Sequence, residues 1–143
     1  MCLSGIMQRR NGAEKVGEIM VTEKNHVDQI TKPGPFGGNG EITVRNILDG
    51  PKAMYEKGRV FCHTTVYSGS SIGFHVHDNE SETYYILSGH GIFNDDGQVV
   101  EVGPGDVLFT GDNQGHGIEA ACGENIEMIA LILYHNPDHD QTS

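Results

Sequence analysis

Short stretches of strand-forming residues, separated by turn residues, set the limits on how this 143-residue chain can fold. Glycine, asparagine, aspartate or proline bounds each stretch, as at the ends of strands. The nine predicted strands are Glu41–Leu48, Arg59–Tyr67, Ile72–His77, Glu82–Leu87, Gly91–Phe93, Val99–Val102, Asp106–Phe109, Gly115–Ala121 and Ile126–Tyr134. Apart from a short turn near Ala53–Lys57, no long stretch keeps the apolar spacing of a helix. The pattern therefore predicts an all-β fold.

The predicted strands fit one domain in which the strands close on themselves. A sandwich or barrel removes the exposed edges that a long open sheet would leave. We expect residues 1–40 to form an N-terminal extension and loop, 41–134 the barrel, and 135–143 a polar tail. Within the extension, residues 1–19 are expected to be flexible or to form an arm exchanged across a dimer. The stretch Thr31–Glu41, with two prolines and four glycines, is expected to be a loop.

The last predicted strand indicates an interface as well as a core. From Met128 onward both of its faces are largely apolar. Because successive side chains of a strand point to opposite faces, one face is expected to line the barrel and the other to meet a helix or a second subunit. We therefore predict a homodimer. Phe74, Tyr85 and Phe109 are expected in the core.

The balance of charge excludes several kinds of partner. Twenty acidic residues against nine basic ones give a net charge of −11, which repels phosphate backbones and anionic headgroups. Nucleic acid and membranes are therefore not expected as partners. The longest apolar run, Met128–Leu133, is far shorter than the roughly 20 residues that cross a bilayer. The N-terminus lacks the uninterrupted apolar stretch of a secretory signal, so a cytoplasmic location is expected.

Two histidines and a glutamate lie close together in the stretch GFHVHDNESE, residues 73–82. On a strand, His75 and His77 would point to the same face about 6.5 Å apart. Two imidazoles on one face can reach a common metal about 2.1 Å from each ring. Glu82 opens the next predicted strand and can meet them across the hairpin. Glu80 competes for this role, but it falls within the predicted turn, so the sequence favours Glu82.

A second segment, Gly103–Ala120, has a similar arrangement. A strand ends, the residues GDNQG form a turn, and His116 opens the next strand. His116 is therefore a candidate fourth ligand. Two further side chains are candidates for the surroundings of the site. His63 is interpreted as a satisfied half-buried histidine, while for Tyr84 pocket lining and simple aromatic packing both stay open.

In two motifs the sequence resembles the cupin superfamily. The first cupin motif is matched at every position by Gly69, His75, His77, Glu82 and Gly89. The second is matched at Gly105 and His116. It departs from the family pattern where Gly111, Asn113 and Ala120 replace the usual Pro, Gly and Asn. Gly and Asn still permit a tight turn, so these departures affect the loop more than the ligand. The resemblance covers roughly Val60–Tyr134.

The resemblance implies a double-stranded β-helix, or jelly-roll, barrel in which His75, His77, Glu82 and His116 bind one divalent metal. Three imidazoles and one carboxylate suit a transition metal, and we expect Mn, with Fe, Zn, Ni and Cu as alternatives.

The stretch Ser68–Phe93 resembles small single-domain bacterial cupins described as oxalate-decarboxylase-like. This implies a small carboxylate ligand and, if the protein is an enzyme, a metal-dependent lyase or oxidoreductase. Glu80 is a candidate for the proton-delivering acid, although nothing in the sequence singles it out. A metal-dependent dioxygenase or isomerase and a non-catalytic small-molecule or metal-binding module are the alternatives.

Overall fold

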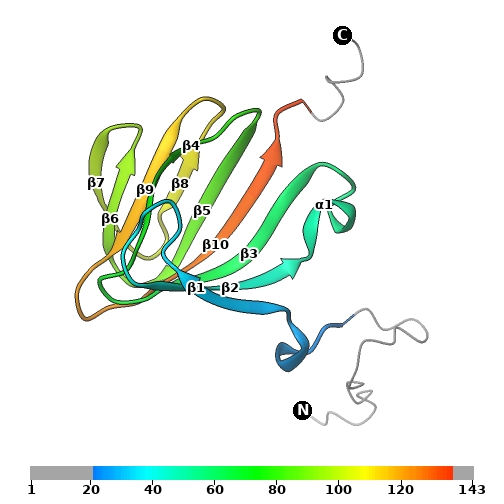
Figure 1. The fold of residues 1–143 in the computed structure, drawn as a ribbon, viewed down its shortest axis with the longest axis horizontal. Helices are drawn as coiled ribbons and strands as arrows, with labels where there is room; N and C mark the ends of the chain where they lie inside the picture. The colour runs from blue at the N-terminus through cyan, green and yellow to red at the C-terminus, as the bar shows by residue number, and fades with distance from the viewer. Residues whose placement is uncertain (1–20, 137–143) are drawn as a thin grey trace, which may run out of the picture.

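The structure, a computed structural model, describes residues 21–136, so the predictions for residues 1–19 and for most of the tail lie outside the described residues. Ten strands and two short helical turns make up this region (Figure 1). The strands are β1 (Gln29–Pro33), β2 (Glu41–Leu48), β3 (Gly58–Val66), β4 (Ser71–Val76), β5 (Glu80–Ser88), β6 (Gly91–Asp95), β7 (Gln98–Val102), β8 (Val107–Thr110), β9 (Gly115–Ala120) and β10 (Ile126–Tyr134). The helical turns are η1 (Lys24–His26) and α1 (Gly50–Ala53). Within residues 21–136, neither helical turn has the length or hydropathy of a bilayer-spanning helix.

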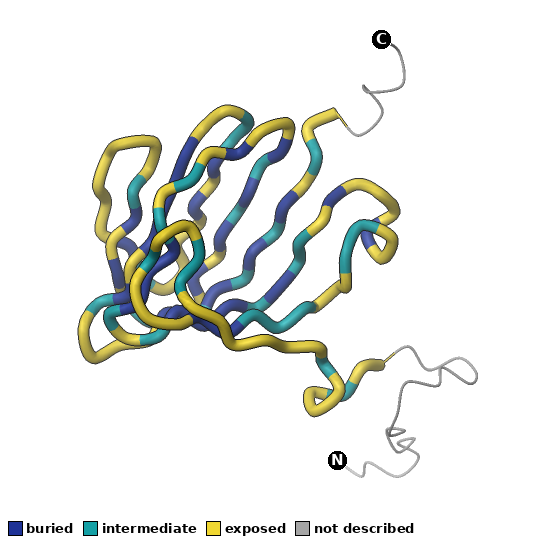
Figure 2. The backbone as a smooth tube through the Cα atoms, viewed as in Figure 1, coloured by how far each residue is buried: buried dark blue, intermediate teal, exposed yellow. Residues whose placement is uncertain are grey.

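Two antiparallel sheets form the two walls of a jelly roll, which confirms the predicted fold class. The larger sheet has the order β1-β2-β3-β10-β5-β8, and the smaller has the order β4-β9-β6-β7. Buried and more exposed positions alternate along β5 and β10, so these two central strands of the larger sheet turn one set of side chains inward (Figure 2). Both sheets contribute to the core, through residues such as Tyr84, Ile86, Met128 and Ile118.

All nine predicted strands are present, with ends shifted by at most two residues, but β1 was missed. Thr31–Pro33, which the sequence predicts to be loop, are the last three of the five residues of β1. All five β1 residues are exposed, and the strand is held by its pairing with β2. A strand without a buried face leaves no alternating pattern in the sequence.

The prediction that Phe74, Tyr85 and Phe109 lie in the core is wrong. These side chains are 49%, 46% and 60% exposed, respectively. In β5 and β8 the inward positions belong to the neighbours Tyr84 and Leu108 instead. Parity along a strand therefore decides burial more strongly here than the apolar character of a side chain.

A β-bulge in β4 sets which side chains of that strand point inward. Ile72 pairs with Ile118 and His75 pairs with His116, so β4 has two residues where β9 has one. The extra residue shifts the alternation by one position. Ile72 and His75 consequently both face the interior, whereas Phe74 faces out.

Candidate metal centre

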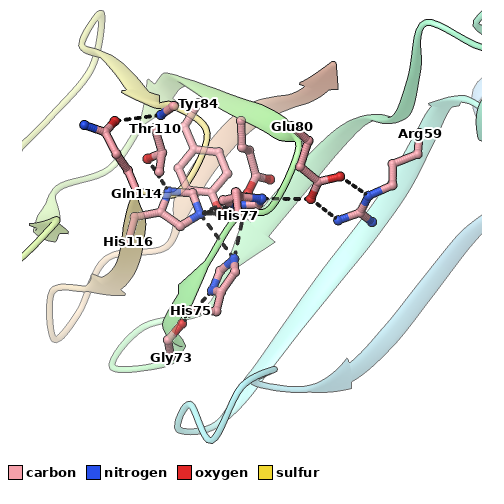
Figure 3. A network of polar contacts seen from close by, with 11 residues as sticks. Arg59, Gly73, His75, His77, Glu80, Tyr84, Thr110, Gln114 and His116 are labelled. Carbon is pink, nitrogen blue, oxygen red and sulfur yellow. Dashed lines mark hydrogen bonds and ion pairs between the residues drawn. The ribbon is translucent and has the colours of Figure 1, made fainter. Parts of the chain in front are cut away.

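Four side chains from both sheets meet in the interior, and Figure 3 labels the three histidines among them with their partners. His75 in β4 and His116 in β9 are cross-strand neighbours. His77 follows the last residue of β4, and Glu82 lies in β5 of the larger sheet. The structure thus brings together the four residues that the sequence analysis singled out.

The donor atoms of these four residues all lie within 4.8 Å of one another. Nε2 of His116 is 3.0 Å from Nε2 of His77, 3.2 Å from Nε2 of His75 and 3.0 Å from Oε2 of Glu82. Oε2 of Glu82 is 3.0 Å from Nε2 of His77 and 4.0 Å from Nε2 of His75. In a six-coordinate site with bonds of about 2.1 Å, neighbouring donors are about 3.0 Å apart and opposite donors about 4.2 Å. The observed spacing fits this arrangement.

Hydrogen bonds at the far nitrogens fix two of the rings. Nδ1 of His75 donates to the backbone carbonyl of Gly73 at 2.9 Å, and Nδ1 of His77 donates to the carboxylate of Glu80 at 2.9 Å (Figure 3). Carbonyl and carboxylate oxygens only accept, so in the neutral ring the proton is on Nδ1 and Nε2 presents a lone pair. Both lone pairs belong to the atoms that face the cluster.

The third ring completes a set of donors that fits a metal ion. His116 is fully buried, and its Nδ1 lies 2.8 Å from the hydroxyl of Thr110. Lone pairs on His75 and His77 and the carboxylate of Glu82 therefore approach one point, where they repel each other unless a proton or a metal ion lies between them. Mixed nitrogen and oxygen donors are the preferred ligands of divalent transition metals.

Buried charge is concentrated on Glu82. Burial by itself would raise the pKa of Glu82. In the metal-free protein, Nε2 of His77 and of His116 can carry a proton in place of the lone pair, and their hydrogen bonds outweigh burial and lower the pKa of Glu82 to about 2. Glu82 is therefore ionised at neutral pH. The hydrogen bond with Glu82, and a further one with Glu80, raise the pKa of His77 against the effect of burial. Burial lowers the pKa of His75, which favours its neutral, metal-binding form.

Glu80, the competing carboxylate, supports His77 from outside the cluster. The predicted turn at Glu80 is wrong, because β5 begins at Glu80, and the side chain points inward like that of Glu82 two residues later. Its carboxylate accepts hydrogen bonds from Nε and Nη2 of Arg59 at 2.7 and 2.6 Å and from His77. The hydrogen bond from Arg59 lowers the pKa of Glu80, so this carboxylate is ionised and engaged.

A cavity of about 400 Å³ adjoins the cluster, and His75, His77 and Glu82 form part of its lining. Tyr84 also lines it, and its ring stacks on His116 with centroids 5.0 Å apart, so both interpretations of Tyr84 apply. At the edge, Phe36 stacks on the imidazole of His75 with centroids 3.9 Å apart.

Sequence reasoning missed Thr110 and Phe36, which contact the cluster, and Arg59, which contacts Glu80 behind it. Only Thr110 left a usable signal, because it ends the strand before the turn that leads to His116. His63 lies apart from the cluster, and its Nε2 is 2.6 Å from the carboxylate of Glu127. This agrees with the interpretation of His63 as a satisfied, half-buried histidine.

The metal-free protein is expected to lose stability in acid through Glu82. Its pKa is about 2 in the fold against the ordinary value of 4.5, so folding favours the ionised form. The stabilisation, on the order of 3 kcal/mol, is fully present above about pH 4.5 and is lost as the pH falls toward about 2. Urea unfolding of the wild type and Glu82→Gln should give free energies that converge over this range. Glu101→Gln, on an exposed face of β7, is the control. If the difference in free energy of unfolding between the wild type and Glu82→Gln does not change with pH, the low pKa of Glu82 is contradicted.

Comparisons with known proteins agree with the fold. The sequence profile of a family described as "Cupin domain" matches residues 62–133. An oxalate-binding protein from Thermotoga maritima is 36% identical over 119 residues, which cover 83% of this chain and 98% of that protein.

Solved structures give the same result. The crystal structure of a predicted oxalate decarboxylase from Thermotoga maritima is 36% identical, has a TM-score of 0.75, and matches over 80% of this chain and 99% of that one. A polyketide cyclase from Streptomyces resistomycificus is 19% identical with a TM-score of 0.61, over 82% of this chain and 80% of that one. At this low identity the second likeness shows the fold alone.

Proposed function

The chain belongs to the cupin family, and on that premise we propose that it binds one divalent transition metal and takes a small carboxylate at that metal. The proposed ligands are His75, His77, Glu82 and His116. The observation that carries the proposal is the approach of two Nε2 lone pairs, the His116 ring and an ionised carboxylate to one point.

Manganese is the proposed metal, with Fe, Zn, Ni and Cu as the alternatives. The right-angle spacing of the donors, 3.0 to 3.2 Å, supports an ion that accepts six ligands, as Mn or Fe does, over four-coordinate Zn. Bound there, the metal would supply a positive charge that holds and polarises a carboxylate oxygen.

A carboxylate ligand fits the charge and the open positions of such a centre. One carboxylate among four ligands leaves about one positive charge on a divalent ion. Four protein ligands leave two of six positions, which suits a pair of oxygens from one ligand. Burial raises the pKa of Tyr84 well above its ordinary value, so its hydroxyl keeps its proton and can donate to a bound oxygen. The name of the Thermotoga maritima oxalate-binding protein supports the same ligand class.

Turnover of the carboxylate, in an oxalate-decarboxylase-like manner, would need a group near the metal that gives up a proton readily at neutral pH, unlike Tyr84, whose pKa is raised well above its ordinary value. Glu80 and Glu82 are the two carboxyl groups among the described residues that line the cavity, and the pKa of each is lowered by its hydrogen bonds. This observation favours the second candidate function, a non-catalytic binding module, over a lyase. A metal-dependent dioxygenase or isomerase stays an alternative.

Calorimetry with oxalate tests the proposal and separates its two forms. Oxalate is expected to bind the manganese-loaded protein and not the metal-free protein. Equal binding to both would contradict a metal-held carboxylate. Release of formate and carbon dioxide from oxalate above a manganese-only control would establish turnover. Binding of oxalate without product would support the non-catalytic binding module.

We also propose a homodimer that forms through the outer face of the larger sheet. The outer apolar patch consists of Phe61, Tyr85, Val107, Phe109, Ile129 and Leu131. The strand register makes it continuous, because Tyr85 is opposite both Val107 and Ile129, and Leu131 is opposite Phe61. Apolar patches of this extent are uncommon on monomers and often mark subunit contacts.

Val107→Asp is expected to convert the dimer to a monomer, because it would bring two charges into the apolar contact. Light scattering coupled to size exclusion would show the mass fall by half. Val99→Asp is the matched control, since Val99 on β7 is 70% exposed and Val107 is 65% exposed. A wild-type protein with the mass of one chain would contradict the proposal.

A cytoplasmic location is the last part of the proposal. Its support is that Cys62 and Cys122, the cysteines within the described residues, are free thiols. Free thiols are typical of reducing compartments. Cell fractionation would test the location directly.

A further inference from the structure

We infer that the cavity beside the cluster selects carboxylates that carry an apolar chain, and that longer-chain 2-oxo acids fit it better than oxalate does. The inference deepens the proposed function and rests on it, because the proposed metal would hold the carboxylate and keto oxygens. The apolar chain would extend into the cavity.

The size of the cavity argues against oxalate as the best-fitting ligand. The volume is about 400 Å³. At about 30 Å³ for each water in the liquid, this is room for on the order of a dozen waters. Oxalate has only two carbons and four oxygens, so it would leave about half of the space to water. Pockets that bind larger ligands begin near 300 Å³.

The floor of the cavity next to the cluster is apolar. Across the larger sheet, Glu82 is opposite Ile132, which in turn is opposite Val60. In the next row, Ala130 is opposite Cys62, and both are almost fully buried. Ala130 and Cys62 have small side chains, and the cavity lies above them. A ligand leaving the metal in this direction would meet methyl, methylene and thiol groups.

The polar groups of the lining are largely engaged with each other. Arg59 is paired with Glu80 through two hydrogen bonds, and the hydroxyl of Thr64 lies 3.4 Å from Sγ of Cys62. Lys32, an exposed residue of β1, is the one described cation of the lining that has no ion pair. A second carboxylate would therefore find one partner at the rim and none on the floor.

Phe36 extends the apolar lining at the edge of the cavity. Its ring stacks on His75 at an interplanar angle of 11°, and it is 63% exposed. Its φ of 57° lies in the left-handed region, which is costly for a bulky residue. The loop that holds this backbone is fixed by a hydrogen bond from the Gly73 amide to the carbonyl of Pro35. The aromatic ring is thus held beside the proposed metal, where it can contact a ligand chain.

A homologous series of 2-oxo acids measures the apolar contribution on the intact protein. Pyruvate, 2-oxobutanoate, 2-oxopentanoate and 2-oxohexanoate share the same chelating end and differ by one methylene each. Burial of a methylene raises the affinity about fourfold, so the series should span about sixtyfold in dissociation constant. Calorimetry would use the full chain loaded with manganese, with oxalate as the reference ligand.

The outcomes separate the inference from the proposed function. If the affinity rises along the series and 2-oxohexanoate binds more tightly than oxalate, the result supports both the inference and the proposed function. Oxalate binding with a flat or falling series would overturn the inference alone. Absence of binding by oxalate and by every 2-oxo acid would overturn the proposed function and the inference with it. Tighter binding of 2-oxoglutarate than of 2-oxohexanoate would assign the far end of the cavity to a second carboxylate at Lys32, and would also overturn the inference.

Filling the floor of the cavity tests where the apolar chain of the ligand lies. Ala130→Leu is expected to reduce the span of the series to less than about tenfold and to leave the affinity for oxalate within about twofold. Ala53→Leu, on exposed α1, adds the same side chain outside the cavity and should leave the full span. If Ala130→Leu does not fold, Val60→Phe provides a second way to fill the same floor. Equal losses for oxalate and 2-oxohexanoate would show that these positions act on the metal centre, against the inference.

Discussion

His75→Ala is expected to lower the affinity of the protein for manganese by more than about a hundredfold. Loss of a hydrogen-bonding partner behind a ligand already costs about 10–100-fold, and this substitution removes a proposed ligand itself. His75 is the suitable position because its side chain is 13% exposed and its only hydrogen-bond acceptor outside the cluster, within residues 21–136, is the backbone carbonyl of Gly73. Its removal should therefore disturb the core less than removal of the fully buried His116.

Metal content by mass spectrometry and titration of the apoprotein with manganese would measure this effect. His90→Ala is the matched control, since His90 is 62% exposed and bonds to Glu124 on the surface. The control should bind manganese like the wild type. Unchanged metal content in His75→Ala would reassign the ligands, and a wild type without transition metal under metal-replete conditions would remove the metal proposal altogether.

Gly73→Ala is expected to destabilise the fold by about 3 kcal/mol and to weaken manganese binding at least about tenfold. A Cβ at Gly73 would overlap the carbonyl oxygen of Phe36, so either the loop or β4 must move. The loop carries the ring that stacks on His75, and the Gly73 carbonyl accepts the hydrogen bond from Nδ1 of His75. Stability and metal affinity should therefore fall together.

Gly37→Ala separates steric overlap from the cost of a backbone angle. Gly37 lies in the same loop with a φ of +74°, and a Cβ there would meet no atom within 4 Å. Only the left-handed angle should matter, so the loss is expected to be about 1 kcal/mol, with manganese affinity unchanged. Urea unfolding and manganese titration of both variants would check these values. Equal effects in the two variants would contradict the role assigned to the Gly73 contact.

The sequence predicted the strands whose one face is buried, because alternation is a local property. Ile126–Tyr134 was placed to the residue, since its apolar run ends at turn residues on both sides. β1 escaped prediction because its side chains are all exposed and its pairing with β2 depends on backbone groups. Phe109 was misassigned because an apolar residue does not reveal which face of its strand it occupies.

The convergence of the candidate ligands could be predicted from their spacing in the sequence, whereas the residues that hydrogen-bond to them from behind could not. His75, His77 and Glu82 are joined by one short turn, so strand parity alone brings them together. Arg59 reaches Glu80 from another strand 21 residues earlier in the chain, a contact that depends on the tertiary arrangement. The metal itself stays a prediction that the donor chemistry supports.

The β-bulge in β4 gives the protein a single residue, Gly73, whose two backbone groups report on two parts of the site. Gly73 lies between the positions of β4 that pair with β9, so its N–H and C=O are available to other partners. The N–H donates to Pro35 at the base of the Phe36 loop, and the carbonyl accepts from His75. Slow hydrogen exchange at the Gly73 N–H would follow the docking of the loop, and the chemical shift of the Gly73 carbonyl carbon would follow the orientation of the imidazole. The two resonances of this one residue could thus be used to observe metal loading and the docking of the Phe36 loop in the same titration.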